Sequence, residues 1–243
     1  MMATLLLRFA APMQSWGDES KYDIRQSWRE PSKSGVIGLL DAAMGLRRDS
    51  DEVARLSSAL RMGVRVDMPG RVIMDYQTAR PPKYNSKREV RYLPNGAPMM
   101  ADSPYVTSRY YLCDACFLVG LESPDEALLE VLADSLRAPC FPLYLGRRAC
   151  PPTLPILLGI RSCSLTDALG HEPWLAPDWY CRKHPEARLR MILETPKGQP
   201  AWHSLRDAPL SFSPVHRQYG PRGVEPEQYI VIGDSRHDPM AEL

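Results

Sequence analysis

The sequence predicts an α+β fold, because short apolar runs of strand length alternate with segments of helical periodicity. The clearest helix signal begins at Lys33, where Ser32 or Ser34 can cap the first turn and Gly45 lies where the helix should end. A second, amphipathic helix is predicted over residues 124–136, with acidic residues near its start. These two helices are the firmest elements of the predicted fold.

The strand candidates complete the order of this fold. Apolar runs at residues 4–9 and 110–121 predict two strands, and residues 62–68 alternate as a half-buried strand. Residues 72–76 are expected to pair back on residues 62–68 as a hairpin. A short helix is expected over residues 51–60, and further strand candidates lie at residues 141–145 and 156–160. The main order, strand, helix, strand, strand, helix, strand, is that of ferredoxin-like domains and of RNA-recognition modules.

The C-terminal third is expected to form a smaller unit. The chain has 24 Pro and 15 Gly, and the prolines are dense between residues 139 and 155 and from residue 173 onward, which indicates stiff, irregular connections. Short apolar runs at residues 189–193 and 229–232 predict strands. We therefore expect an RNA-recognition-like domain over residues 1–160 and a small, irregular β-rich domain over residues 161–243.

Composition excludes several classes of protein. No apolar run approaches the roughly 20 residues of a membrane span, and the start of the chain lacks a signal-peptide layout, which predicts a cytoplasmic protein without a membrane partner. Cys113 and Cys116 have the spacing of a redox or zinc pair, but no second pair follows them. Reduced structural thiols are the favoured interpretation, and neither a metal nor a cofactor is expected.

A basic segment between the strands lacks the periodic apolar face of a core element. Between residues 79 and 100 it carries five cations and one acid, a local charge of +4 in a chain whose formal net charge is +1. The cations are Arg80, Lys83, Lys87, Arg88 and Arg91. Tyr84 and Tyr92 lie among them, so phosphates and an unstacked base could both be bound, as in a clamp for single-stranded nucleic acid. A solvated, partly disordered loop is the alternative.

Two further groups near the N-terminus could contact a ligand. Gln14 and Trp16 belong to a compact group at residues 13–17, which is either a packing plug or a place where Gly17 lets backbone approach a ligand. Arg25 lies in a polar segment at residues 18–30 that is expected to be a loop. Lys33 and Ser34 lie at a predicted helix start, which could serve equally as a phosphate seat or as an ordinary cap.

A second basic and aromatic group lies at residues 144–151. Gly146 permits a tight turn from which Arg147 and Arg148 project in different directions, so that one can pair internally while the other reaches a phosphate. A surface salt-bridge pair is the alternative.

Four short motifs, in the same order across residues 1–160, resemble the CasD family, which supplies a subunit of the type I-E CRISPR surveillance complex, Cascade. They are Met13-Gln-Ser-Trp-Gly, Pro31-Ser-Lys-Ser-Gly-Val-Ile-Gly-Leu-Leu, Tyr111-Leu-Cys-Asp-Ala and Tyr144-Leu-Gly-Arg-Arg-Ala-Cys-Pro.

The resemblance implies an RNA-recognition-like fold with an inserted β-hairpin thumb, at about residues 79–109. It also implies a role in antiviral defence: the subunit grips the 5′ handle of the crRNA, packs against the backbone subunit CasC, and meets the large subunit CasA near the PAM end of the target DNA. The residues expected to bind RNA are Gln14, Trp16, Arg25, Lys33, Ser34, Arg80, Lys83, Tyr84, Lys87, Arg88, Arg91, Arg109, Tyr144, Arg147 and Arg148.

Catalysis is the competing hypothesis. Metal-independent cleavage of precursor crRNA would need a His or Tyr base and a cation such as Lys33 or a residue of the basic segment. All five histidines lie in the C-terminal third, far in sequence from that segment, and none belongs to a recognisable motif. Because the resemblance implies that another subunit cuts the RNA, we expect a non-catalytic RNA-binding subunit.

Overall fold

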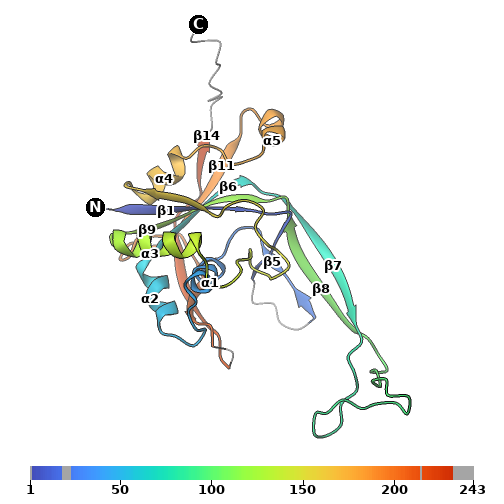
Figure 1. The fold of residues 1–243 in the computed structure, drawn as a ribbon. Helices are drawn as coiled ribbons and strands as arrows, with labels where there is room; N and C mark the ends of the chain where they lie inside the picture. The colour runs from blue at the N-terminus through green and yellow to red at the C-terminus, as the bar shows by residue number, and fades with distance from the viewer. Residues whose placement is uncertain (1, 18–22, 214, 232–243) are drawn as a thin grey trace.

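The computed structural model describes residues 2–17, 23–213 and 215–231, and Figure 1 shows how their elements are arranged. A six-stranded sheet forms the centre of the body, and all neighbouring strands in it are antiparallel. In spatial order the strands are β10 (Leu157–Arg161), β1 (Ala3–Ala10), β9 (Cys116–Ser123), β6 (Arg61–Met68), β11 (Arg188–Leu193) and β14 (Gln228–Val231). Strands from distant parts of the chain therefore share one sheet.

Helices cover both faces of this sheet (Figure 1). Leu5 and Leu7 of β1 belong to the main core, which includes the inner sides of three helices, whereas Leu6 packs in a second cluster with α4. Because β1 is buried on both faces, its apolar residues run on without alternation. The helices are α1 (Lys33–Met44), α2 (Glu52–Ala59) and α3 (Glu126–Arg137) on the main core, α4 (Leu165–His171) on the opposite face, and α5 (Asp178–Lys183).

The two strongest helix predictions are confirmed, with small shifts at their ends. Ser32 caps α1, since its Oγ accepts a hydrogen bond from the Gly35 N–H at 3.3 Å, and Gly45 ends the helix in the left-handed region at φ 74°. Asp125 caps α3 by accepting a hydrogen bond from the Leu128 N–H at 3.0 Å. Side-chain oxygens that accept hydrogen bonds from the first N–H groups therefore fix both helix starts.

Two facing glycines let α4 lie close against the sheet. Gly63 of β6 and Gly120 of β9 are register partners. A Cβ atom at Gly63 would lie 2.8 Å from the Leu169 Cδ1 atom, and one at Gly120 would lie 2.6 Å from the Leu165 Cδ1 atom. Glycine in a strand interior often marks such a close approach. Here it admits two leucines of one helix.

Three strand predictions are wrong. β7 (Arg71–Ala79) pairs with β8 (Tyr105–Cys113) and not with β6, because the chain turns away from the sheet at Gly70. The expected long strand at residues 110–121 is divided between β8 and β9, since Asp114 adopts a positive φ of 57°. Residues 141–145 form a loop, where Pro139 and Pro142 lack the N–H that a ladder needs.

The C-terminal third contributes to the main sheet and to a separate strand pair. β11 and β14 continue the sheet beyond β6, and the predictions at residues 156–160 and 189–193 correspond to β10 and β11. The prediction at residues 229–232 corresponds to β14, although residue 232 lies outside the described part of the chain. β12 (His203–Ser211) and β13 (Gln218–Val224), which were not predicted, pair with each other. The expected domain boundary near residue 160 stays a prediction.

Short strands line the entrance to the projecting part of the molecule. β2 (Met13–Gln14) and β4 (Ile24–Arg25) flank β8, and β3 (Trp16–Gly17) pairs with β5 (Ser27–Trp28). The loop expected at residues 18–30 is thus partly strand, and residues 18–22 lie outside the described part of the chain. None of the helices in the described ranges is long and apolar enough to cross a membrane.

Candidate nucleic-acid interface

A two-stranded ribbon, β7 and β8, carries the basic segment away from the body (Figure 1). The register runs without interruption from the Arg71–Cys113 pair to the Ala79–Tyr105 pair. Its sequence is rich in β-branched and aromatic residues, which favour strands. At the root, Gly70 has a φ of 67°, and a Cβ atom there would lie 2.4 Å from the Cys113 carbonyl oxygen, so only glycine permits this bend. We call residues 71–113 the arm.

The tip of the arm, residues 80–104, is an irregular loop closed by three isolated β-bridges. The bridges join Pro82 to Met100, Tyr84 to Val90, and Tyr92 to Pro98. A turn at the tip is fixed by Asn85, whose Oδ1 atom accepts hydrogen bonds from the Lys87 and Glu89 N–H groups at 2.9 and 3.0 Å. No residue of the tip belongs to the described core clusters. The tip thus keeps its shape through backbone and turn contacts.

The cations of the tip differ in what they contact. Lys83 forms an ion pair with Asp102, with its Nζ atom 2.7 Å from Oδ1, and this lysine lowers the pKa of the Asp102 carboxyl. Arg80 donates to the Asp102 carbonyl oxygen at 3.1 Å. In the described part of the chain, the other three cations of the tip have no ion-pair partner, and all are exposed: Lys87, Arg88 and Arg91. These three are free to neutralise phosphates.

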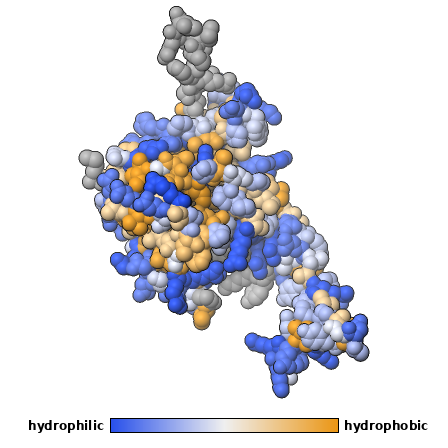
Figure 2. All heavy atoms as spheres, in the orientation of Figure 1, coloured by the Kyte–Doolittle hydropathy of each residue, from blue (hydrophilic) through white to orange (hydrophobic). Residues whose placement is uncertain are grey.

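Two tyrosines stand beside these cations. Tyr84 is 55% exposed and Tyr92 is 64% exposed, so both rings are accessible to a ligand. Figure 2 shows the tip as a mostly hydrophilic end with a small hydrophobic area, separate from the body. Exposed rings among free cations are the combination that stacks bases and binds phosphates in single-strand binding sites. The structure therefore groups the predicted residues of the basic segment at one end of the molecule.

At the root of the arm, Arg147 joins three segments of the chain. Its guanidinium donates to the Tyr110 carbonyl oxygen at 3.2 Å and to the Arg25 carbonyl oxygen at 3.1 Å, and it lies 4.7 Å from the centre of the Tyr111 ring. Arg148 beside it is exposed. One arginine of the pair thus binds internally and the other faces solvent, and within the described residues neither forms an ion pair.

The turn that holds Arg147 depends on Gly146. Its φ is 86°, and a Cβ atom there would overlap the Ser15 carbonyl oxygen, at 1.7 Å. The carbonyl oxygen of the half-buried Tyr144 accepts a hydrogen bond from the Gly146 N–H at 3.1 Å. Arg109 lies beside Arg25 in the β4–β8 register, and the buried Nε atom of Arg109 has no hydrogen-bond partner within the described part of the chain. The structure thus brings Arg25, Arg109, Tyr144, Arg147 and Arg148 together at the root of the arm.

The predicted ligand contacts of Gln14 and Trp16 are wrong, because both side chains are fully buried. The Gln14 amide donates to the carbonyl oxygens of Phe9 and Ala115 at 3.2 and 2.8 Å, and its oxygen accepts from the Trp16 indole. The Trp16 ring stacks on Phe9 with centroids 5.2 Å apart. These residues form the packing plug that was the alternative interpretation.

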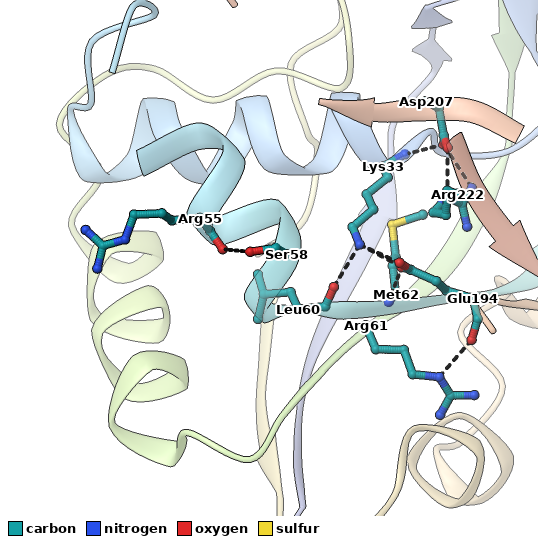
Figure 3. A network of polar contacts seen from close by, with 9 residues as sticks. All are labelled: Lys33, Arg55, Ser58, Leu60, Arg61, Met62, Glu194, Asp207 and Arg222. Carbon is teal, nitrogen blue, oxygen red and sulfur yellow. Dashed lines mark hydrogen bonds and ion pairs between the residues drawn. The ribbon is translucent and has the colours of Figure 1, made fainter. Parts of the chain in front are cut away.

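The phosphate seat predicted at Lys33 is also wrong, as Figure 3 shows. Lys33 is 2% exposed, and its Nζ atom lies 2.7 Å from the Glu194 carboxylate and 2.8 Å from the Leu60 carbonyl oxygen. The Lys33 N–H donates to Asp207, which also pairs with Arg222 at 2.7 Å. Burial lowers the pKa of the Lys33 ammonium, while Glu194 opposes this shift. The chain's own carboxylates therefore occupy the helix start.

Ser34 is half-buried at the same helix start, with its Oγ atom 3.3 Å from that of Ser32. The structure does not bring Lys33 to the surface of the arm or its root. Sequence reasoning missed another group, the exposed apolar side chains along the ribbon: Val72, Ile73, Met74, Tyr76, Tyr105 and Val106. The available signal was that the strand-forming residues of β7 and β8 flank a long segment without an apolar face, so that no core element is at hand to cover them.

Residues 4–225 match the family described as "CRISPR-associated protein (Cas_Cas5)". This match spans most of the sequence, and the chain belongs to that family.

The predicted relation to CasD is confirmed. The chain is 31% identical, over 96% of its length and 97% of the relative, to "CRISPR system Cascade subunit CasD" of Escherichia coli (strain K12). Two solved structures are similar to it. A chain of a "CRISPR RNA-guided surveillance complex" has a TM-score of 0.69 at 32% identity, covering 96% of this chain and 95% of that one. A "Cas protein" has a TM-score of 0.66 at 37% identity, covering 94% and 95%.

Proposed function

We propose that this protein is a non-catalytic subunit of a CRISPR RNA-guided surveillance complex, in which the tip and root of the arm hold the 5′ handle of the crRNA. The observation that carries the proposal is a group of exposed cations, Lys87, Arg88 and Arg91, which form no ion pair within the described ranges and lie beside two exposed tyrosines at the end of the ribbon. Similarity to a Cascade subunit over nearly the whole chain supports it.

The fold and its surfaces support the finer parts of this proposal. The order β10-β1-β9-β6 supports a ferredoxin-like core with the arm inserted as a thumb between the second and third strands. Exposed apolar side chains on the ribbon support packing against a neighbouring backbone subunit, CasC. Contact with CasA and with target DNA near the PAM end, and a cytoplasmic location, belong to the same proposal by similarity to CasD.

The division of the chain into two parts is also a proposal. We assign residues 1–160 to the RNA-recognition-like part and residues 161–243 to a C-terminal part. The separate β12–β13 pair supports such a part, although β11 and β14 add to the main sheet.

Neutralising the three free cations of the tip tests the RNA contact. The tip variant combines three substitutions, Lys87→Ala, Arg88→Ala and Arg91→Ala. It should bind a single-stranded RNA with the repeat-derived handle sequence more weakly than the wild type. The slope of binding affinity against salt concentration should fall by roughly 0.7 for each phosphate that the variant no longer neutralises. A matched control replaces three exposed arginines of the body: Arg47, Arg55 and Arg137. Equal slopes for the tip variant and the wild type would remove the arm from the RNA site.

A cleavage assay tests the non-catalytic assignment. His171 and His184 each contact, through Nδ1, the backbone carbonyl oxygen four residues earlier, at 2.8 and 2.9 Å, so this nitrogen of each ring is engaged and does not serve as a catalytic base. Incubating the isolated protein with repeat RNA in EDTA should leave the RNA intact but bound. Site-specific cleavage in EDTA would instead establish the metal-independent endoribonuclease.

A further inference from the structure

A cleft of about 560 Å³ lies where β6 ends and the arm begins. Clefts of this size commonly bind small ligands or single nucleotides. The last residues of β6 and the first of β11 line it, together with α5 and the segment that follows α5. The lining residues used below are Asp67, Trp174, Tyr180, His184, Glu186 and Arg188.

Aromatic rings form one wall of the cleft. The His184 ring stacks on Tyr180 with centroids 4.1 Å apart and an interplanar angle of 26°, and Trp174 meets Tyr180 edge-on at 6.0 Å. The Trp174 indole donates to the Asp67 carbonyl oxygen at 2.9 Å, which fixes this wall to β6. His184 is exposed, and its Nδ1 contact with the Tyr180 carbonyl oxygen holds the ring in place. One face of the imidazole is covered, and the other is available for stacking.

Arg188 lines the cleft, whereas Arg182 and Lys183 belong to the adjoining α5 and lie outside its lining. Within the described ranges, the three side chains concerned form no ion pair: Arg182, Lys183 and Arg188. The Lys183 Nζ atom lies 5.5 Å from the Trp179 ring centre, and the Arg188 guanidinium lies 5.1 Å from that of Tyr229. By contrast, Arg190 in the same cleft is neutralised by Glu30 and Glu227. Arg190 therefore stabilises the fold through its ion pairs, whereas the charge of Arg188 can attract an anionic ligand.

We propose that this cleft binds an unpaired nucleotide of a single-stranded nucleic acid, at a site separate from the tip of the arm. The base stacks on His184, the adjoining phosphate meets Arg188, and the Glu186 carboxylate accepts a hydrogen bond from an exocyclic amino group of the base. The Arg188 guanidinium suits the phosphate of a nucleotide, and the exposed His184 ring suits its base. The inference rests on the proposed function, because Pro69 lines the cleft and directly precedes the bend at Gly70, where the arm begins.

Fluorescence anisotropy with the full chain tests the cleft, using labelled 15-nucleotide RNA and DNA of one sequence. His184→Ala should weaken binding about tenfold, within the range measured for removal of one base–ring stack. His184→Phe keeps a ring and should restore most of the affinity. Arg188→Ala should lower the salt slope by roughly 0.7. The paired control replaces Arg48 and Lys197, which are exposed and lie outside the cleft.

Running the tip variant in the same assay separates this inference from the proposed function. Weakening by both the cleft and the tip variants supports both sites, and weakening by the cleft variants alone supports the cleft and removes the tip. Normal binding by both His184→Ala and Arg188→Ala overturns the cleft as a nucleotide site. Assembly of these variants with neighbouring subunits does not change this conclusion. Equal weakening of RNA and DNA identifies contacts to base and phosphate, and a larger effect on RNA adds a contact to the 2′-hydroxyl.

Discussion

Lys33 shows how burial decides between two roles for a lysine at a helix start. The same sequence, Ser32-Lys33-Ser34-Gly35, suits a phosphate seat when the lysine is exposed and an internal anchor when it is buried. In this structure the ammonium joins α1 to the end of α2 through Leu60 and to Glu194, which follows β11. The residue therefore connects the N-terminal helix to the C-terminal third of the chain.

Replacing Lys33 should destabilise the protein. Lys33→Ala leaves Glu194 partly buried without its cation, and removal of one partner of a buried ion pair costs about 3 kcal/mol at the lower end of measured values. Chemical denaturation should show a lower midpoint for Lys33→Ala and an unchanged one for Lys197→Ala, in which an exposed lysine is removed. A normal midpoint with weakened RNA binding would return Lys33 to the RNA site.

Asp41 makes the stability of the fold depend on pH. Its carboxylate oxygens are buried in α1 and have no hydrogen-bond partner among the residues that the structure describes, and burial raises the pKa of this carboxyl from 3.8 to about 7. Between these two values the folded state holds a proton that the unfolded state has released. The free energy of unfolding should therefore fall as pH rises from about 4 to about 7, and then level off.

Asp41→Asn should remove this pH dependence of the free energy of unfolding. At pH 8 the variant should exceed the wild type by at least about 1.4 kcal/mol, the equivalent of one pKa unit, and the difference should shrink near pH 4. Urea denaturation at several pH values measures it, with the exposed Asp134→Asn as the control. A difference that is the same at pH 4 and pH 8 would show that Asp41 does not titrate in this range.

At the scale of elements, the tip of the arm should be removable. The residues before and after the tip, Ala79 and Tyr105, are register partners, so a short Gly-Ser turn can join them in place of residues 80–104. The tip adds nothing to the described core, and the melting temperature should change by less than about 4 °C, equivalent to about 1 kcal/mol in a chain of this size.

The shortened protein should nevertheless fail to retain its RNA. Circular dichroism of the isolated variant, together with co-purification of crRNA and neighbouring subunits, measures both effects. Unfolding of the variant would make the tip part of the core. Normal assembly with full-length crRNA would show that the tip is dispensable for the handle.

Elements with a strong local signal could be predicted from the sequence, and pairing partners could not. Caps and apolar periodicity gave α1 and α3, and the local excess of positive charge located the tip of the arm. The partner of β7 depends instead on a bend at Gly70, which directs the strand away from the sheet. β12 and β13 were missed because Pro209 and Pro221 interrupt their patterns. Gln14, Trp16 and Lys33 were assigned to the surface because burial is a property of the assembled fold.

At the scale of the whole molecule, the C-terminal third completes the body. α4 covers one face of the sheet through Leu165 and Leu169, and β11 pairs with β6 from Arg190 to Leu193. A fragment of residues 1–160 would expose Leu6 and Leu118 and leave β6 as an open edge. We expect this fragment to melt without a cooperative transition in circular dichroism. A sharp transition would show that the two proposed domains fold independently.

The ribbon also fixes how far the protein reaches. Each of its strands has nine residues, which corresponds to a length of about 30 Å. Since no core packs against its outer part, the ribbon can lengthen or shorten without disturbing the body. Adding two residues to each strand would move the tip outward by roughly 7 Å and keep every side chain on its original face, whereas adding one would exchange the faces. Strand length in this arm therefore sets the distance between the body and the ligand of the tip, in steps of two residues per strand.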